Sequence, residues 1–186
     1  MVVVAIPTII ERGDAWKEVA EMWEALSPEV TVVPSWRKGT WAAGLNEVWE
    51  SHKGLFVCAS DDMAPLPGWY QAVEPWLEKG IVAPQVHDPR FSKWDPGTPD
   101  GFETEMSSFP IIGESFLGAI FPLPEELHYF TDDLISLRAR QAGIPTIAVP
   151  SCEIVHCPDL RGRGAGMSEK DRMDHDRKLY ESLTAP

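Results

Sequence analysis

The chain has 186 residues, of which 44% are hydrophobic, and this length predicts a single globular domain that buries about two thirds of its unfolded surface. With 29 acidic and 16 basic residues its net charge is -13, which argues against broad binding of nucleic acids or anionic membranes, although a local basic patch would override that repulsion. No apolar run reaches the roughly 18 residues of a membrane-spanning helix, MVVVAIPT is too short for a signal peptide, and three sparse cysteines favour reduced thiols, so we expect a soluble, cytoplasmic protein.

The first 33 residues predict a strand, a helix and a second strand. A β-branched run over residues 2–6 ends at Pro7 and Thr8, as a strand that feeds a loop does. A helix is expected from about Asp14, with apolar side chains at 3.6-residue spacing. Residues 30–33 form the second strand. Because a helix joins them, the two strands are expected to be parallel with a right-handed crossover, which opens an α/β fold.

The next strand is followed at once by two acidic residues. Apolar or small residues over 55–59 predict a buried strand, and Asp61 and Asp62 follow it. In a doubly wound sheet, ligands bind at the carboxyl ends of the strands. Two adjacent carboxylates there suit Mg²⁺ or Mn²⁺, which binds oxygen ligands and substrate phosphates. The alternative is that both residues only open the turn before Pro65 and Pro67.

Two other segments are candidates for ligand contacts. Arg37 and Lys38 precede a helix that begins near Trp41, where backbone N–H groups and two cations suit a phosphate, although an ordinary basic turn is an equal interpretation. A helix over 67–77 and a strand over 80–86 lead into residues 87–108, which show no periodicity and exceed the usual length of a structureless loop. Its Trp94 is a candidate to cover a ligand, and a mobile surface insertion is the alternative.

The last third of the chain predicts short strands around one helix. A short strand is expected over 109–113, and the apolar segment GESFLGAIFPLP is expected to bring Glu114 and Ser115 close to the core. Residues 132–142 are expected to form a helix that Thr131 caps. Its first turn holds Asp132 and Asp133, where the helix dipole stabilises carboxylates. Two further short strands are expected over 146–149 and 153–156. A flexible basic loop and a polar helix over 169–183 then follow.

In this order, the segments resemble a small GT-A fold glycosyltransferase, most similar to the family 2 group, over residues 2–156. The resemblance is carried by the Pro-Thr turn after the first strand, by RKGTWAAGLNEVWESHKGLFVCASDDMAPLPGW, and by TDDLISLRARQAGIPTIAVPSCEIVH, which is the most specific match. Three positions depart from the family pattern. Ser60 stands where an Asp often opens the metal motif, Thr131 replaces the usual Glu before Asp132, and no acidic residue follows the second strand.

The resemblance implies a single-domain GT-A, Rossmann-like α/β fold with a mostly parallel sheet flanked by helices. Residues 1–160 form the catalytic domain, and 161–186 form a basic loop and a helix of the same domain. The implied metal ligands are Asp62, Asp61 and His156, and the implied catalytic base is Asp132. Contacts to the sugar donor are expected from Pro7, Thr8, Glu11, Arg12, Lys38, Asn46, Asp61, Arg161 and Arg163. Contacts to the acceptor are expected from Trp94, Glu114, Ser115 and Asp133.

The implied activity is transfer of a sugar from a nucleoside-diphosphate sugar to an acceptor hydroxyl, with Mn²⁺ or Mg²⁺ and with inversion at the anomeric carbon. The acceptor is open among a glycan, a lipid, a protein and a hydroxymethylated DNA base. One alternative is a sugar nucleotidyltransferase, although those enzymes usually carry a Gly-rich, Arg-containing loop after the first strand and IPTIIERGD has no such glycines. A second is a binding module without turnover. A third is a zinc site of Cys152, His156 and Cys157, which lacks an evident fourth ligand.

Overall fold

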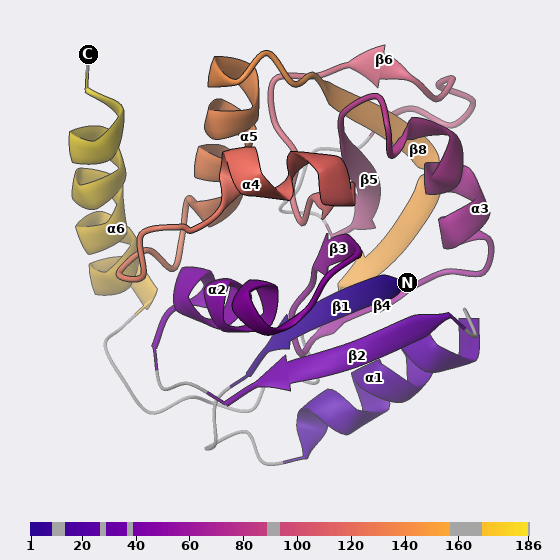
Figure 1. The fold of residues 1–186 in the computed structure, drawn as a ribbon, viewed down its shortest axis with the longest axis horizontal. Helices are drawn as coiled ribbons and strands as arrows, with labels where there is room; N and C mark the ends of the chain where they lie inside the picture. The colour runs from indigo at the N-terminus through magenta and orange to yellow at the C-terminus, as the bar shows by residue number, and fades with distance from the viewer. Residues whose placement is uncertain (9–13, 27–28, 37–38, 89–93, 157–168, 186) are drawn as a thin grey trace.

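The computed structural model describes residues 1–8, 14–26, 29–36, 39–88, 94–156 and 169–185, and it shows one curled sheet with helices on both faces (Figure 1). The order along the sheet is β2-β1-β3-β7-β5-β8-β4, and β6 pairs with β8. The strands are β1 (Val2–Pro7), β2 (Val30–Ser35), β3 (Leu55–Cys58), β4 (Met63–Pro65), β5 (Ile81–His87), β6 (Phe102–Glu103), β7 (Ile111–Ile112) and β8 (Thr146–His156). The helices are α1 (Ala15–Leu26), α2 (Trp41–Ser51), α3 (Trp69–Val73), η2 (Glu74–Trp76), η3 (Glu114–Phe116), α4 (Leu117–Ile120), α5 (Thr131–Gln141) and α6 (Glu169–Thr184).

The long strands of the sheet all run in the same direction. β1 pairs in parallel with β2 and β3, and β5 pairs in parallel with β8. The short β7 lies antiparallel between β3 and β5 and joins these two halves. The carboxyl ends of β1, β2, β3, β5 and β8 therefore meet at one edge. The α/β fold with a mostly parallel sheet, predicted from the sequence, is confirmed.

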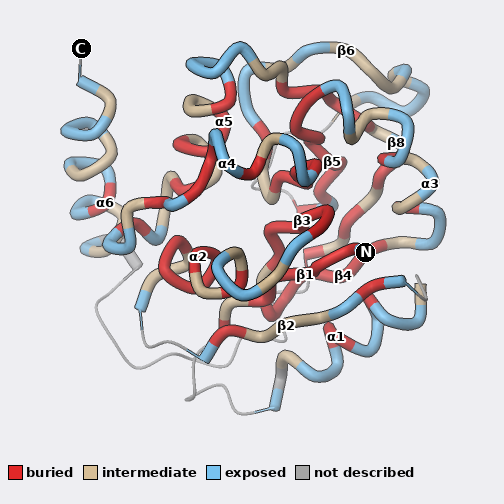
Figure 2. The backbone as a smooth tube through the Cα atoms, viewed as in Figure 1, coloured by how far each residue is buried: buried red, intermediate tan, exposed pale blue. Residues whose placement is uncertain are grey.

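Strand residues alternate between two hydrophobic cores, one on each face of the sheet. In β1, Val2, Val4 and Ile6 join the core that includes residues of α1 and α3, whereas Val3 and Ala5 join the core that includes residues of α2, α4 and α5. This alternation is the period-2 geometry of a strand buried on both faces. Figure 2 shows the resulting band of buried backbone along the central strands.

Two bulky indoles fill the first core. The rings of Trp23 and Trp69 meet edge to face with centroids 5.1 Å apart, and both side chains are fully buried. Trp23 also donates a hydrogen bond from Nε1 to the carbonyl oxygen of Met63 at 2.9 Å. Because Met63 begins β4 directly after the acidic pair, this contact ties α1 to the segment that carries Asp61 and Asp62.

Several elements differ from the sequence prediction. The two expected strands over 146–149 and 153–156 are one strand, β8, and its register against β5 shifts after Pro84. The helix expected over 67–77 is the short α3 followed by a 3-10 turn. The prediction that Thr131 caps α5 is wrong, because the N-cap residue is Phe130 and Thr131 is already helical. Among the described residues, no helix is both long enough and apolar enough to cross a membrane.

Candidate active site at the carboxyl edge of the sheet

Thr8 and Asp61 meet at the ends of two neighbouring strands. Thr8 follows β1 and donates from its hydroxyl to Oδ2 of Asp61 at 2.7 Å, and both residues are buried. The backbone N–H of Thr8 also donates to the carbonyl oxygen of Ser35, at the end of β2, at 3.1 Å. The structure therefore brings these two predicted site residues together. This contact fixes the first carboxylate of the acidic pair.

The second carboxylate, Asp62, faces a histidine that a further carboxylate holds. Nε2 of His156 lies 3.2 Å from Oδ2 of Asp62, and Nδ1 of His156 lies 2.5 Å from Oδ2 of Asp88. All three residues are at most 4% exposed. The Ser60 hydroxyl donates to the other carboxylate oxygen of Asp62. A buried row of carboxylate, imidazole and carboxylate therefore spans the carboxyl ends of β3, β5 and β8.

Strand register explains why these three residues meet. β4 pairs antiparallel with β8 and places Met63 opposite His156, which brings Asp62 beside the imidazole. β5 pairs in parallel with β8 and places His87 opposite Val155, which brings Asp88 to its other side. Asp88 was not among the site residues predicted from the sequence. Its signal was an acidic residue directly after a buried strand, the same signal that singled out the pair after β3.

The side chains of this row offer ligand atoms that suit a divalent cation. A neutral imidazole donates from one nitrogen and accepts at the other, so a His156 that donates to Asp88 turns a lone pair toward Asp62. The 3.2 Å between the two facing atoms is close to the separation of adjacent ligands on an octahedral ion with bonds of roughly 2.1 Å. A carboxylate and an imidazole are ligands for Mn²⁺ among other metals. The residues present therefore fit a metal.

The described residues do not form a complete metal site by themselves. No group of three or more His, Cys, Asp or Glu side chains within them is arranged to hold an ion. Cations that bind nucleotides commonly take one or two protein carboxylates and complete their shell with water and substrate phosphates. Asp62 and His156 match such a partial set. The proposed zinc alternative depends on Cys157, which lies outside the described residues.

Asp132 brings a carboxyl group of unusual acidity to the same edge. It lies half-buried in the first turn of α5, and burial together with the charge of Asp133 raises its pKa to about 7. The N–H of Asp133 donates to Oδ1 of Asp132 at 3.1 Å, which opposes that rise in part. Burial and then the charge of Asp132 raise the pKa of Cys58, the last residue of β3. Asp132 therefore stands close to the carboxyl end of that strand.

Other predicted contacts lie elsewhere or are already engaged. Asn46 donates from Nδ2 to the carbonyl oxygen of Leu123 at 2.7 Å and accepts from the N–H of Leu123 at 2.8 Å, and it is buried, so both polar atoms of its side chain already hold the backbone of Leu123. Glu114 and Ser115 are exposed, and because they follow the antiparallel β7 they lie toward the amino ends of the parallel strands. The structure therefore does not bring these two residues to the acidic pair.

Pro7 and Trp94 are partly buried and contact other elements of the structure. Pro7 ends β1 and packs against α2, where a Cβ added to Gly44 would lie 2.6 Å from the Cβ of Pro7. The N–H of Trp94 donates to the side-chain oxygen of Gln85 at 3.0 Å, and its ring meets Phe102 edge to face. The remaining predicted donor contacts lie outside the described residues: Glu11, Arg12, Lys38, Arg161 and Arg163.

The chain was also compared with known proteins. No protein-family model matches the sequence, and no curated protein matches it. Solved structures do match. A197 from STIV has a TM-score of 0.60 at 16% identity, over 86% of this chain and 87% of that one. TarS 1-349 of S. aureus, in complex with UDP-GlcNAc, has a TM-score of 0.65 at 14% identity, over 99% of this chain and 67% of that one.

A third solved structure, GalNAc-T7 with UDP, GalNAc and Mn²⁺, has a TM-score of 0.57 at 12% identity, over 84% of this chain and 37% of that one. At these identities the likeness concerns the fold. TarS and GalNAc-T7 are GT-A glycosyltransferases. The fold expected from the sequence is therefore confirmed: this chain has the GT-A fold.

Proposed function

We propose that this protein is a glycosyltransferase that moves a sugar from a nucleoside-diphosphate sugar to an acceptor hydroxyl. The observation that carries the proposal is the buried row of Asp62, His156 and Asp88 at the carboxyl edge of a GT-A sheet, with Asp132 near the same strand ends. The structural neighbours TarS and GalNAc-T7 carry UDP-GlcNAc and UDP with GalNAc, respectively, which supports a nucleotide-sugar donor.

The row of Asp62, His156 and Asp88 would act on the diphosphate leaving group of this reaction. Breaking the glycosidic bond to a nucleoside diphosphate leaves negative charge on the diphosphate, which has to be neutralised. Asp62 and His156, with Asp61 beside them, would hold Mn²⁺ or Mg²⁺, which when bound supplies positive charge to the diphosphate oxygens. Asp88 fixes the orientation of His156, and Thr8 fixes Asp61. The basic residues expected around the donor remain predictions.

Asp132 would act on the acceptor hydroxyl. We assign it the role of general base that takes the proton of the acceptor hydroxyl as the oxygen attacks the anomeric carbon. Attack opposite the leaving group inverts that carbon in a single displacement. A base works best when its pKa lies near the working pH, and the pKa of Asp132 is about 7. Asp133, next to it, remains the predicted acceptor contact.

The test is release of nucleoside diphosphate from a panel of nucleotide sugars, with and without added saccharide acceptors, in Mn²⁺, Mg²⁺ or EDTA. Asp132→Asn keeps the size of the side chain and is compared with Asp95→Asn, at an exposed position. Loss of a positioned base costs typically 10²- to 10⁴-fold in rate, so Asp132→Asn is expected to lose about that much turnover while still binding donor. Near-normal turnover in Asp132→Asn would remove this role, and donor binding without turnover by the wild type would favour a binding module.

A further inference from the structure

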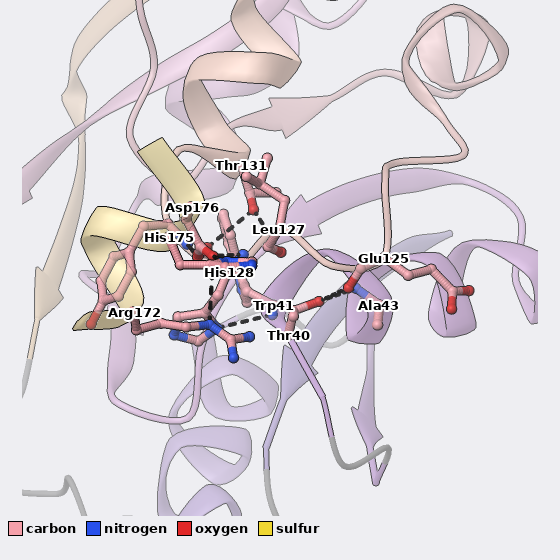
Figure 3. Close-up of polar contacts among 11 residues, drawn as sticks. Thr40, Trp41, Ala43, Glu125, Leu127, His128, Thr131, Arg172, His175 and Asp176 are labelled. Atoms are coloured by element: carbon pink, nitrogen blue, oxygen red, sulfur yellow. Dashed lines mark hydrogen bonds and ion pairs between the residues drawn. The ribbon is translucent and has the colours of Figure 1, made fainter. Parts of the chain in front are cut away.

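The loop over residues 125–130 leads into α5 and contacts two other helices, α2 and the C-terminal α6 (Figure 3). On one side it holds the start of α2. The hydroxyl of Thr40 donates to the carbonyl oxygen of Glu125, and the N–H of Ala42 donates to that of Leu127 at 3.2 Å. The N–H of Trp41 donates to Nδ1 of His128 at 3.1 Å. Hydrogen bonds therefore hold the loop against the start of α2.

On its other side, the loop is held by Asp176 of α6, a carboxylate with no exposed surface. Oδ2 of Asp176 accepts from the backbone N–H groups of His128 at 3.0 Å and Tyr129 at 2.8 Å. Oδ1 lies 3.0 Å from Nδ1 of His175 and 3.6 Å from Nε of Arg172. Burial raises the pKa of Asp176, but the hydrogen bonds from His175 and the two backbone groups outweigh it and hold that pKa below its ordinary value.

The residue that follows these two amides also depends on α6. Phe130 is the N-cap residue of α5, its φ of 61° is left-handed, and its side chain has no polar atom to cap the helix. Its ring stacks on Tyr180 of α6 with centroids 5.7 Å apart, and the guanidinium of Arg177 lies 5.8 Å from its centroid. Three consecutive residues ahead of α5 are thus held by the C-terminal helix.

These contacts end two residues before the carboxylate that we assign as the base. Thr131 begins α5 and Asp132 follows it, so the position of the carboxyl group depends on where the helix starts. Burial, then the charges of Asp133 and Asp132 with an opposing one from Arg140, shift the pKa of Tyr180 upward, which places α6 near both carboxylates. We propose that Asp176 is a positioning residue that holds the start of α5, and with it Asp132, in the active geometry. This inference rests on the proposed function.

The test compares Asp176→Ala with Asp176→Asn and with Asp174→Ala, which changes an exposed carboxylate of the same helix. Asparagine keeps an oxygen able to accept from both amides, whereas alanine does not. Misplacing a catalytic group by about 1 Å costs up to about 10²-fold in rate, so Asp176→Ala is expected to lose up to about that much kcat with the donor KM unchanged. Asp176→Asn is expected to keep most of kcat, and Asp174→Ala all of it. Activity is measured at a temperature where circular dichroism shows each variant folded.

Hydrogen exchange gives a readout that needs no turnover. In Asp176→Ala, faster exchange is expected at the amides of residues 128–134 and not in β1 or α1. Should alanine prevent folding, Asp176→Glu keeps the charge but moves the carboxylate by one methylene, and it is expected to lower kcat and to speed exchange in the same segment. Unchanged kcat in a folded Asp176→Ala, equal losses in alanine and asparagine, or unchanged exchange would overturn the proposal. A wild type without turnover refutes the transferase, whereas exchange still decides whether Asp176 holds this segment.

Discussion

Asp132 has a raised pKa, and this property has a measurable cost in stability. Burial and the charge of Asp133 raise its pKa from 3.8 to about 7. Between these values the folded protein holds a proton that the unfolded chain has released, so this group makes the free energy of unfolding fall as the pH rises from about 4 to 7. Asp132→Asn removes this effect.

Urea unfolding of wild type and Asp132→Asn at pH 4, 6 and 8 measures the effect of that carboxyl group. The difference in unfolding free energy is expected to favour the variant increasingly from pH 4 to 8, because only the wild type must ionise this half-buried acid. Titrating groups that do not interact with Asp132 contribute equally to both proteins and cancel. A difference that stays constant across this range would show that the pKa of Asp132 is not raised.

Asp133 provides a second test of the same carboxyl group. Its negative charge helps to raise the pKa of Asp132, so Asp133→Asn is expected to lower that pKa. If Asp132 is the base, the rise of kcat/KM with pH then moves to lower pH, while the loss of activity at the plateau reports any acceptor contact. A pH profile with an unmoved acidic limb would separate Asp132 from the proton transfer.

Asp88 is the residue that the sequence analysis missed, and it makes a prediction about metal affinity. It contacts the ring nitrogen of His156 that faces away from Asp62. Partners that orient a metal-binding histidine typically contribute 10- to 100-fold in affinity, so Asp88→Asn is expected to weaken Mn²⁺ binding by about that factor. Calorimetric titration with Asp95→Asn as control measures it. Equal affinities in the two variants would contradict the role of Asp88 in orienting a metal-binding His156.

At the scale of elements, the packing of α2 on β1 supports the site. A Cβ at Gly44 would lie 2.6 Å from that of Pro7, whereas one at Gly118, in α4, meets no described atom within 4 Å. Alanine favours a helix over glycine by about 1 kcal/mol, but overpacking costs typically about 1–3 kcal/mol. Gly44→Ala is therefore expected to lower the free energy of unfolding by about 1–2 kcal/mol. Gly118→Ala is expected to be neutral or stabilising in the same denaturant titration, and equal stability of the two variants would contradict the close approach.

Strand pairing accounts for most of what the sequence did not predict. Apolar runs and helical spacing located β1, β3, β5, α1, α2 and α5, because those signals are local. The union of β8 into one strand depends on pairing with β5, whose register passes from Pro84 opposite Val149 to Gln85 opposite Glu153. That shift sets the position of His156 beside Asp88. A sequence pattern contains no such register, so the contact of Asp88 with His156 was not predictable, although an acidic residue directly after a buried strand marked Asp88 as a candidate.

At the scale of the whole molecule, the order of motifs along the chain was sufficient for the fold. Acidic residues after a strand, an acidic helix start and a strand that ends in histidine resembled a GT-A protein, and the comparison with TarS and GalNAc-T7 confirms that fold. The contact of α6 with the loop before α5 was not evident from the sequence, because nothing in the polar sequence of α6 distinguishes the buried Asp176 from its other acidic residues.

The net charge of -13 bears on the donor as well. An acidic protein repels a nucleoside diphosphate at long range, so cations have to supply the local attraction. We therefore assign the donor to the carboxyl edge only together with a divalent metal. We propose that Asp62 and His156 form a metal-dependent site for a nucleotide sugar.

Thermal unfolding with UDP-GlcNAc and other nucleotide sugars, in Mn²⁺, Mg²⁺ or chelator, tests this claim most directly. A ligand at 100 times its dissociation constant stabilises a fold by about 2.7 kcal/mol, which a melting curve resolves. We expect a donor to raise the Tm of wild type and of the control Asp95→Ala only with metal, and not to raise that of Asp62→Ala. A shift that persists in chelator and in Asp62→Ala, or no shift with any donor and either metal, would contradict the claim.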